Sequence, residues 1–560
     1  MTLVSELKRI GEFDMNYEKL AQLLFPDIDK EPSYYEEMYP ARPLQEGQKV
    51  TRFAPSPTGF LHIGGLFAAF VSRLTAADGV FYLRIEDTDK KREVEDGVTG
   101  IIDGLRAFGV TFDEGVTGVD SQSGDYGPYQ QSRRREIYQT FAKKLVLDGL
   151  AYPCFCTAEQ LDAVRQRQEA EKLNPGYYGE FAACRELTLE QIEEKIKAGE
   201  SYVLRFKAPN GDKKIILDDL IKGKIEMPEN NMDIVLLKSD GIPTYHFAHA
   251  VDDHLMRTTH VVRGDEWISS FPVHVQLFKA CGFRVPKYAH ISPIMKEDDG
   301  GKRKLSKRKD PEAAVGYYAE VGYPAQSVTE YLLTIANSNF EEWRKANADA
   351  PQSAFPFTLK KMSQSGALFD LVKLNDVSKN VISRMTAEQV LEGIKAWAAE
   401  YDKELYALIC RDEQYALGIF TIDRYTAKPR KDIGKWSDAR QYVSYFYDEI
   451  FERTDALPEN ISADDARVIL DEYLRVYSAQ DDKDGWFDRI KAMCEPLGYT
   501  PNVKEFKQNP EAFKGHVGDI SAVIRIAVTG RKNTPDLYSI MQLMGTEHIE
   551  KRIREFADSL

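Results

Sequence analysis

The pattern of apolar and polar positions changes character along the chain, and its first third alternates between strand-like and helix-like stretches. Val50 and Phe53 give strand character to the segment that begins at Lys49, and Val80–Ile85 is a continuous apolar run typical of a parallel strand buried on both faces. Helical spacing follows, with apolar residues at Ile101, Ile102, Leu105 and Phe108. This alternation predicts an α/β protein with a Rossmann-type doubly wound parallel sheet, whose ligands lie beyond the carboxyl ends of the strands.

Between about Gln130 and Tyr245 the pattern changes to a long charged helix, a group of cysteines and short strands. Tyr202–Phe206 and Ile215–Leu217 are the clearest of these strands. An α+β domain inserted between the two halves of the sheet explains the change. The sheet is then expected to resume with the strand His260–Val262, the helix Phe271–Cys281 and a last strand, Tyr288–Met295.

Beyond residue 310 strand signals nearly vanish, which predicts an all-helical C-terminal region. Tyr442, Phe446 and Ile450 share one helical face, and Ala522–Val528 has the composition of a buried helix. At the other end, Leu20, Leu23 and Leu24 predict a short helix, and Pro32, Pro40 and Pro43 predict a linker. The expected parts are an N-terminal extension (1–48), the first half of the sheet (49–129), the insertion (130–245), the second half (246–298), a following domain (299–384) and a helical domain (385–560).

Length, composition and charge narrow the class of protein. A chain of 560 residues with 43% apolar residues fits roughly three to five packed domains. No run is long enough to span a membrane and the first residues lack a secretory h-region, so the cytoplasm is the expected compartment. The net charge of −15 at first argues against a nucleic-acid partner. Phosphates, however, respond to local clusters such as Arg133–Arg135, Lys302–Lys309 and Lys428–Lys431, each of which could equally be a solvated face.

Two stretches carry candidate chemistry. In residues 49–66 the Pro55, Pro57 and Gly59 turn ends the first strand, and a helix begins near Gly64. The first amides of such a helix and its positive dipole end suit a phosphate chain, with His62 beside them as a hydrogen-bond donor. An ordinary strand-turn-helix with a satisfied histidine is the alternative. The second stretch, Lys302–Lys309, is too cationic to be a buried element.

With both stretches in view, the sequence resembles the bacterial glutamyl-tRNA synthetases, a family of class I aminoacyl-tRNA synthetases. His62–Gly65 looks like the HIGH motif in a His-Ile-Gly-Gly form, and Lys304–Arg308 looks like the KMSKS loop. Leu83–Asp89, Pro243–Ala248 and Arg263–Trp267 match the family in the same order. The resemblance covers roughly residues 49 to 560, and leaves the N-terminal extension without an assigned role.

The resemblance implies an activity and its partners. It implies that L-glutamate is activated with ATP and Mg²⁺ to glutamyl-adenylate and transferred to the 3′ end of tRNA(Glu), releasing AMP and pyrophosphate. It also implies an insertion that grips the acceptor end, a helical domain that binds the anticodon, and a monomer. The residues it assigns to the ATP site are Pro57, Thr58, Gly59, His62, Gly64, Gly65, Lys304, Ser306 and Lys307, of which His62, Gly64, Lys304 and Lys307 are expected to act in catalysis.

Charge matching points to the amino-acid pocket. Glutamate carries two carboxylates and one ammonium group, so a selective pocket needs two cations and one anion. Arg52, Arg263 and Glu86 fit that count. The resemblance assigns Arg52 with Tyr245 to the side-chain carboxylate, Arg263 to the α-carboxylate and Glu86 with Ser56 to the amine. It also places His249 in this pocket, at a position where many relatives carry a different polar residue; a structural ion pair between Arg52 and Glu86 is the alternative.

Two further groups of residues invite a metal interpretation. Asp252 and Asp253 lack a histidine or glutamate at ligand spacing, so they are expected to position the neighbouring strand and pocket. Cys154, Cys156 and Cys184, with Tyr178 or its neighbour Tyr177, are similar to a zinc site in some relatives, although the spacing from tyrosine to the last cysteine is stretched. The sequence alone leaves two interpretations of these cysteines: a zinc site, or three buried thiols.

Each alternative function would require a sequence feature that differs from what this chain has. Glutaminyl-tRNA synthetases share the chemistry, but typically have Pro-Glu-Pro-Asn-Gly where this chain has Pro55–Gly59, and a histidine where it has Gly65. A shortened relative that glutamylates a modified tRNA base lacks the C-terminal helical domain. A catalytically silent RNA-binding paralogue would have no need of Arg52, His62, Glu86 and Lys307. Whether tRNA(Gln) is also charged with glutamate stays open.

Overall fold

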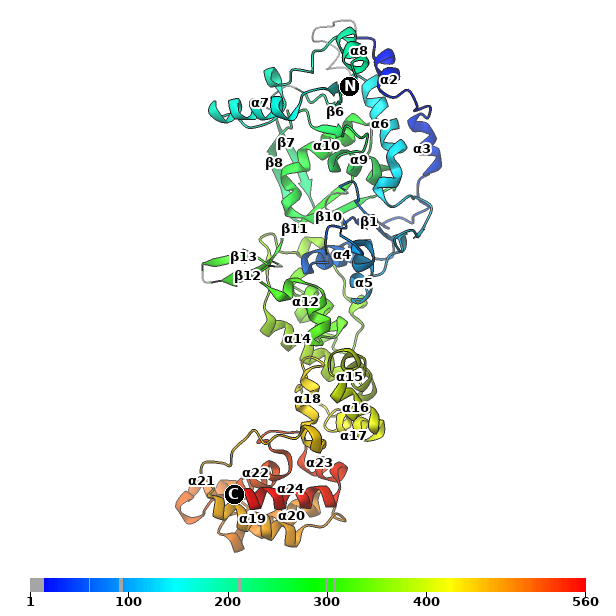
Figure 1. Cartoon of the computed structure of the whole chain (residues 1–560). Coiled ribbons are helices and arrows are strands. Elements are labelled where there is room, and N and C mark those ends of the chain that lie inside the picture. The colour runs from blue at the N-terminus through cyan, green and yellow to red at the C-terminus, as the bar shows by residue number, and fades with distance from the viewer. Residues whose placement is uncertain are drawn as a thin grey trace. The chain divides into compact units, whose positions relative to one another are not determined.

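The computed structural model describes residues 15–59, 61–89, 94–209, 211, 213–298, 300–306 and 308–560 (Figure 1). The chain divides into two compact units, one made of residues up to 317 together with 332–370, and the other of residues 318–331 and 371–560. Within the described ranges, no helix is both long and apolar enough to cross a membrane. Lys307, which was assigned to the ATP site, lies outside the described residues.

A parallel sheet forms the centre of the first unit, as predicted. Its first half pairs in the order β1 (Val50–Phe53), β2 (Val80–Leu83), β3 (Glu114–Val116) and β4 (Gln122–Ser123). Its second half pairs in the order β10 (His260–Gly264), β11 (Lys287–Ile291), β7 (Lys214–Asp219) and β8 (Gly223–Pro228). Only β4 and β8, at the two outer edges, run antiparallel to their neighbours. The halves meet at β1 and β10, where the Thr259 N–H donates to the Val50 carbonyl over 3.0 Å.

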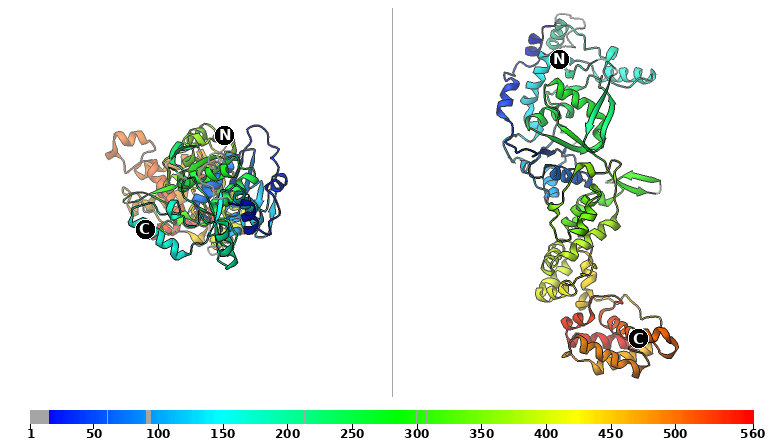
Figure 2. Two further views of the ribbon diagram at one scale, coloured as in Figure 1. Left: turned by 90° about the horizontal axis from the view of Figure 1, so that it is seen from above. Right: turned by 180° about the vertical axis from the view of Figure 1, so that it is seen from behind.

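Helices cover this sheet, and they begin close to the predicted positions. They are α4 (Ile63–Ala76), α5 (Gly97–Arg106), α9 (Tyr245–Leu255), the 3-10 helix η4 (Asp265–Ser270) and α10 (Phe271–Ala280). α9 and α10 pack against each other. Figure 2 shows this green part of the chain from above and from behind. Because α4 follows β1 and α9 precedes β10, both helices approach the place where the two halves of the sheet join.

Two predicted strands differ from the structure. Ile215–Leu217 was expected within the insertion, but β7 pairs with β11, where Asp219 lies opposite Tyr288, and so extends the central sheet. Tyr288–Met295 was expected as one strand. It is instead β11 followed by β12 (Ile294–Asp298), which forms a hairpin with β13 (Gly301–Lys304). Pro293 lies at the break, because proline has no N–H to donate to a ladder.

The insertion has its own small sheet and three helices. The strands β5 (Ala151–Cys154), β6 (Val203–Phe206) and β9 (Val235–Leu237) pair antiparallel in that order. The helices are α6 (Arg135–Leu147), α7 (Ala158–Ala170) and α8 (Leu189–Lys197). α7 and α8 each begin with a capping box, in which Thr157 and Thr188 accept from backbone N–H groups. The predicted strand Tyr202–Phe206 is found here as β6, but two helices of 13 residues each, α6 and α7, occur where one long helix was expected.

The described part of the N-terminal segment, residues 15–48, contains two helices that pack on α6. The predicted helix is α2 (Tyr17–Leu24), with Leu20 and Leu24 buried. Pro32 was expected in a linker, but it opens α3 (Pro32–Met38). A first-turn proline costs the helix nothing, because the N–H it lacks would have no partner there.

After the β12–β13 hairpin the chain becomes almost entirely helical. The elements are η5 (Pro311–Ala313), α11 (Gly316–Val321), α12 (Ala325–Ala336), α13 (Phe340–Ala346), η6 (Gln352–Ala354), η7 (Leu359–Lys361) and the two-residue strand β14 (Ala367–Leu368). β14 pairs in parallel with β12.

The C-terminal region is helical, as predicted, around one large apolar core. Its α-helices are α14 (Leu371–Arg384), α15 (Ala387–Tyr401), α16 (Lys403–Arg411), α17 (Glu413–Thr421), α18 (Asp438–Val443), α19 (Ala463–Val476), α20 (Lys483–Cys494), α21 (Val503–Gln508), α22 (Val517–Thr529), α23 (Leu537–Met544) and α24 (Thr546–Ser559). Ala522–Val528 lies inside α22, as expected. Tyr442, Phe446 and Ile450 do not share one helix, because α18 ends at Val443 and two 3-10 turns, Ser444–Phe446 and Asp448–Ile450, follow.

Candidate active site

A cavity of about 370 Å³ opens where the carboxyl ends of β1 and β10 meet. Arg52 and Arg263, both buried, enter it from these strands, at the edge of the sheet where doubly wound folds bind ligands. The predicted site residues that line it are Arg52, Ser56, His62, Gly64, Gly65, Glu86, Tyr245, Arg263 and Lys304. Segments distant in sequence therefore contribute to one cavity.

His62 caps the helix that follows the first strand. It is the N-cap of α4, and its Nδ1 accepts from the Gly64 N–H over 2.9 Å. Since Nδ1 is an acceptor, the proton of the neutral ring lies on Nε2, which gives His62 the donor role expected of it. The Gly65 and Leu66 N–H groups donate to the His62 carbonyl. The three amides expected to hold phosphates are thus engaged within the cap, which leaves the positive end of the helix dipole to attract an anion there.

Around Arg52 the cavity wall is built from paired charges. The Arg52 Nε lies 3.2 Å from Asp253 Oδ2, and its Nη1 donates to the Val262 carbonyl. Asp253 also accepts from Arg84, over 2.6 Å, and Arg84 in turn donates to Glu86 over 3.1 Å. The structural ion pair considered for Arg52 and Glu86 is therefore not the one observed; each has a different partner.

The carboxyl groups near Arg52 differ in the direction in which their pKa is shifted. Burial alone would raise the pKa of Asp253, but Arg52 and Arg84 hold it well below its usual value. Burial raises the pKa of Glu86, and the nearby arginines offset only part of this effect. Asp252 accepts from Gln131, Arg134 and Tyr138, all buried. Both aspartates thus tie α9 to its surroundings.

Around Arg263 the wall is built from histidines. The Arg263 Nε donates to His290 Nε2 over 3.0 Å, and Nη1 donates to His274 Nδ1 over 2.9 Å. Nη2 lies 3.5 Å from the Trp267 carbonyl. Among the described residues no carboxylate forms an ion pair with this buried guanidinium.

His249 does not reach the cavity. It is fully buried, with Nδ1 2.9 Å from Asp253 Oδ2 and Nε2 2.9 Å from the Tyr288 hydroxyl. Its ring stacks on Tyr245, which covers it from the cavity side. Burial lowers the pKa of His249 to about 3, so the ring is neutral. The structure therefore does not bring His249 to the cavity wall: on α9 it lies one turn after Tyr245, whose ring lines the cavity.

Several residues expected at the ATP site lie away from the cavity wall. Pro57, Thr58, Gly59 and Ser306 are not among the residues that line it. Thr58 N–H turns back to the Ser56 carbonyl, and Ser306 N–H donates to Asp310 Oδ2. Asp310 also binds both Nη atoms of Arg303, so the base of the lysine loop is fastened at its two ends.

Sequence reasoning missed parts of the wall that follow the Arg263 strand. Trp267 stacks on Tyr245 with ring centroids 4.2 Å apart, and Glu266 lines the same cavity. The Glu266 carboxylate folds back over Gly264, within 2.2 Å of where a Cβ atom would stand. The Arg263–Trp267 motif was recognised, but its only assigned role was that of the arginine.

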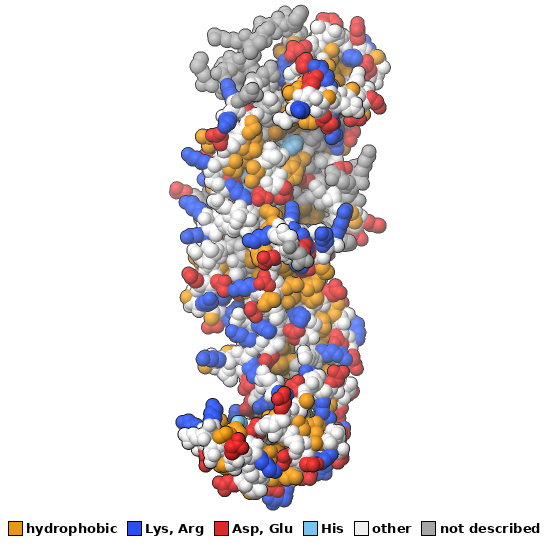
Figure 3. All heavy atoms as spheres, turned by 90° about the vertical axis from the view of Figure 1, so that its left-hand side faces the viewer, with side chains coloured by type: hydrophobic (Ala, Val, Ile, Leu, Met, Phe, Trp, Pro, Cys, Tyr) orange, Lys and Arg blue, Asp and Glu red, His pale blue; other side chains and the backbone are white. Residues whose placement is uncertain are grey.

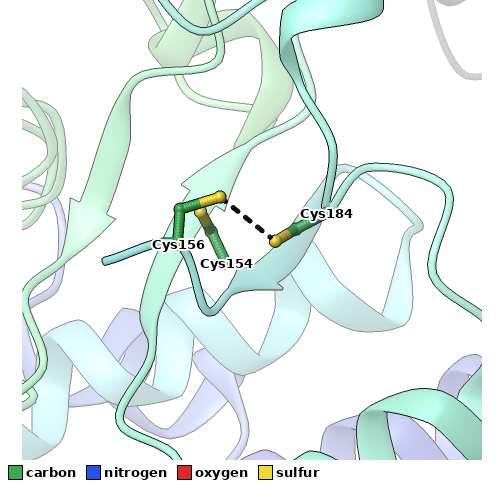
Figure 4. Close-up of side chains that lie close together, drawn as sticks. All are labelled: Cys154, Cys156 and Cys184. Carbon is green, nitrogen blue, oxygen red and sulfur yellow. Dashed lines mark hydrogen bonds between the residues drawn. The ribbon is translucent and has the colours of Figure 1, made fainter. Parts of the chain in front are cut away.

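The three clustered cysteines lie together in the insertion (Figure 4). Their sulfur atoms are all within 4.8 Å of one another, and Cys156 Sγ lies 3.6 Å from Cys184 Sγ. The Tyr177 hydroxyl lies 3.2 Å from Cys156 Sγ and accepts from the Cys184 N–H. Tyr178 is not part of the cluster, because its hydroxyl donates to the Asn174 carbonyl on the surface. Adjacent side chains of this extended segment point to opposite sides, so only Tyr177 faces the sulfurs.

Fold and cavity together have the features of a class I aminoacyl-tRNA synthetase, and a family model described as "tRNA synthetases class I (E and Q), catalytic domain" matches residues 48–376. The chain belongs to this family. A second model, "Anticodon binding domain", matches residues 421–557.

Several relatives of the chain are glutamate–tRNA ligases. The chain is 53% identical to one from Clostridium perfringens (strain SM101 / Type A), over 97% of this chain and 100% of that protein. It is 51% identical to one from Acetivibrio thermocellus, over 96% and 100%. A crystal structure of a glutamate tRNA ligase from Elizabethkingia meningosepticum "in complex with its amino acid" aligns with a TM-score of 0.72 at 28% identity, over 92% of this chain and 100% of that one.

Proposed function

We propose that this chain activates L-glutamate with ATP to glutamyl-adenylate and transfers the glutamyl group to the 3′ end of tRNA(Glu), releasing AMP and pyrophosphate. The observation that carries the proposal is one cavity that holds two buried arginines and one buried glutamate beside His62 and Lys304. That charge set matches two carboxylates and one ammonium group. Because tRNA and ATP are its substrates, the cytoplasm is the expected place of action.

Within the cavity each charged group of glutamate has a counterpart. Arg52 with Tyr245 receives the side-chain carboxylate, Arg263 receives the α-carboxylate, and Glu86 with Ser56 receives the amine. Asp253 holds Arg52 in place, and Arg84 holds Glu86 in place, so both side chains are oriented before the ligand binds. Fixing the groups before the ligand arrives lowers the entropic cost of binding.

The reaction needs positioning and charge stabilisation. An α-carboxylate oxygen attacks the α-phosphorus of ATP and pyrophosphate leaves; a ribose hydroxyl of the terminal tRNA adenosine then attacks the activated carbonyl and AMP leaves. His62 donates to phosphate oxygens through Nε2, and Lys304 supplies a positive charge from the end of β13. Lys307 acts with it by resemblance. Mg²⁺ arrives with ATP, bound chiefly through the phosphates.

Contact with tRNA does not require a basic protein. On the face shown in Figure 3, Lys and Arg side chains are interspersed with Asp and Glu, so the net charge of −15 is not spread as a uniform acidic surface. The helical region binds the anticodon and the insertion holds the acceptor end. Under the same proposal the protein is a monomer. Charging of tRNA(Gln) is tested by the aminoacylation assay described below.

The cysteine cluster fits a zinc ion. Tetrahedral zinc with sulfur ligands at roughly 2.3 Å separates two sulfurs by roughly 3.8 Å, close to the 3.6 Å between Cys156 and Cys184. A hydrogen bond from Cys184 lowers the pKa of Cys154, which favours the thiolate that zinc needs. Cys154, Cys156, Cys184 and the Tyr177 hydroxyl would hold the ion, and the ion would join β5 to the loop before α8.

Elemental analysis of protein never exposed to chelator tests this site. About one equivalent of zinc is expected, lost in Cys156→Ser and reduced in Tyr177→Phe but not in Tyr178→Phe. Less than about a tenth of an equivalent in the native protein would leave three buried thiols as the correct description.

An aminoacylation assay that pairs each purified tRNA with each amino acid tests the function. Glutamate on tRNA(Glu) is the expected product. Glutamine on tRNA(Gln) would indicate the sister activity, and binding of tRNA without any aminoacylation would indicate a silent paralogue. Glutamate on tRNA(Gln) would extend the substrate range without changing the chemistry.

A further inference from the structure

The two arginines of the cavity differ in what surrounds them. Arg52 contacts Asp253, so its charge is balanced inside the protein. Arg263 is just as buried, but its guanidinium contacts two imidazoles and a backbone carbonyl. A buried cation normally has a paired anion. Among the described residues no acidic side chain takes that place beside Arg263.

The hydrogen bonds fix the proton positions on both histidines. Arginine can only donate, so His290 Nε2 and His274 Nδ1 are acceptors and must be unprotonated. The proton of His290 is then on Nδ1, which lies 2.7 Å from Asp219 Oδ2. The proton of His274 is on Nε2, which lies 2.9 Å from His246 Nδ1. Each ring is thus held in one tautomer by a partner on its far side.

These rings are neutral at ordinary pH. Burial lowers the pKa of His274 well below its usual value, and burial also lowers the pKa of His290 and His246. The Asp219 carboxylate, the nearest acid in this chain of contacts, is separated from Arg263 by the His290 ring. Asp219 accepts from the Ile221 and Lys222 N–H groups as well, which satisfies its charge locally.

We propose that His274 and His290 are positioning residues for the acidic amino acid, and that they hold Arg263 by hydrogen bonds from neutral rings so that the substrate carboxylate supplies its missing counterion. This inference rests on the proposed function. A carboxylate in the place of either ring would neutralise Arg263 and compete with the substrate. Two imidazoles orient the guanidinium just as firmly without that competition.

A purely structural role makes a different prediction. The rings of His274 and His290 also pack against aromatic neighbours, with centroids 4.6 Å from His249 and 5.1 Å from Phe271 respectively. If packing were their only role, replacing them would disturb glutamate and ATP binding alike. If they position Arg263, the effect falls on glutamate alone.

The test compares His274→Leu, which removes the acceptor, with His274→Asn, whose side-chain oxygen can take the place of Nδ1. Pyrophosphate exchange is measured with tRNA present while glutamate and ATP are varied separately. His274→Leu is expected to raise the KM for glutamate at least about tenfold, with kcat and the KM for ATP changed less than about twofold, because a hydrogen bond to a charged group is lost. His274→Asn is expected to recover most of the loss. His260→Asn, a half-buried histidine on the same strand β10 as Arg263, serves as the matched control without effect.

A second measurement applies if His274→Leu does not fold. Competitive inhibition by the α-amide of glutamate is compared between the native protein and His290→Phe, which keeps a ring against Phe271 but has no acceptor for the Arg263 Nε. A loss of discrimination between glutamate and its amide is expected.

The outcomes separate the inference from the function it rests on. Equal increases in the KM for glutamate and ATP, unchanged glutamate KM in folded His274→Leu, or unchanged discrimination in His290→Phe would overturn the positioning role. Absence of glutamate-dependent exchange in the native protein would instead overturn the proposed function.

Discussion

The two ends of the cavity use opposite ways of keeping an arginine inside a protein. At the Arg52 end, three buried arginines, Arg52, Arg84 and Arg134, face three carboxylates, Glu86, Asp252 and Asp253. At the Arg263 end, the cation meets neutral imidazoles. In the closed set every charge has a partner before a ligand binds. The open cation gains its partner only when the substrate binds.

The largest effect is expected from Asp253→Ala, which removes the shared partner of Arg52 and Arg84. Two cations then stay buried without compensation, and breaking a buried pair in this way costs about 3–5 kcal/mol in the free energy of unfolding. Urea unfolding of the purified protein measures the loss. Asp120→Asn is the control, since its ion pair with Arg133 is exposed and contributes less than about 1 kcal/mol. An equal, small effect of both substitutions would show that the two ends of the cavity do not differ.

Arg52→Gln and Arg263→Gln together sharpen the comparison. Both are expected to raise the KM for glutamate by a factor on the order of 10 to 100, because each removes a charge-assisted hydrogen bond, while the KM for ATP changes little. Only Arg52→Gln is expected to destabilise the protein, by about 2 kcal/mol, because it leaves Asp253 with one partner fewer. Arg263→Gln leaves no buried carboxylate behind and should be neutral in stability.

Enzyme kinetics and urea unfolding of Arg52→Gln and Arg263→Gln measure these effects on the KM values and on stability. If Arg52→Gln weakened ATP and glutamate binding equally, its assigned role would fail. If Arg263→Gln destabilised as much as Arg52→Gln, a counterion for Arg263 would have to exist.

Acid should act on the buried histidines before it acts on the buried carboxylates. The pKa of His249 is about 3 in the folded protein, against 6.5 as the ordinary value, so the unfolded chain binds more protons between these limits. The stabilisation is complete above pH 6.5 and is lost as the pH falls below it, at about 1.4 kcal/mol per pH unit for each histidine held neutral. Asp253, whose pKa lies well below 3.8, keeps its charge throughout pH 4.5–6.

Unfolding free energies measured at several pH values between 4.5 and 6 test this order. His249→Asn should reduce the pH slope, because asparagine has no proton to gain. A slope that stays the same in the variant would mean that His249 is not held neutral in the folded protein.

The sequence predicted the elements whose signal is local. The apolar run of β2, the helical spacing of α5 and the turn between β1 and α4 each lie within a short stretch, and each was found. The partners of the site are not local. Asp253 is 201 residues from Arg52, and His290 is 27 residues from Arg263 on a different strand, so no spacing rule joins them.

Other misses have equally physical causes. Arg134 belongs to a basic cluster that suggested either phosphate contact or a solvated face, yet it is buried against Asp252. Tyr177 and Tyr178 are neighbours, and only the direction of the extended backbone decides which faces the cysteines. Composition indicates that a charge is present, but burial decides what that charge contacts.

The smallest effect that still separates the two ends is expected from Glu86→Gln. Glutamine keeps an oxygen that can accept from Arg84, so the fold loses little and only the charge offered to the substrate amine disappears. The KM for glutamate should rise about fivefold, which corresponds to about 1 kcal/mol. Because burial raises the pKa of Glu86, the native enzyme should lose the same contribution as the pH falls, and the variant should not. Kinetics across pH 5–8 distinguish the two: a KM ratio between variant and native that stays constant over this range would show that Glu86 keeps its charge and that the amine is bound elsewhere or by dipoles alone.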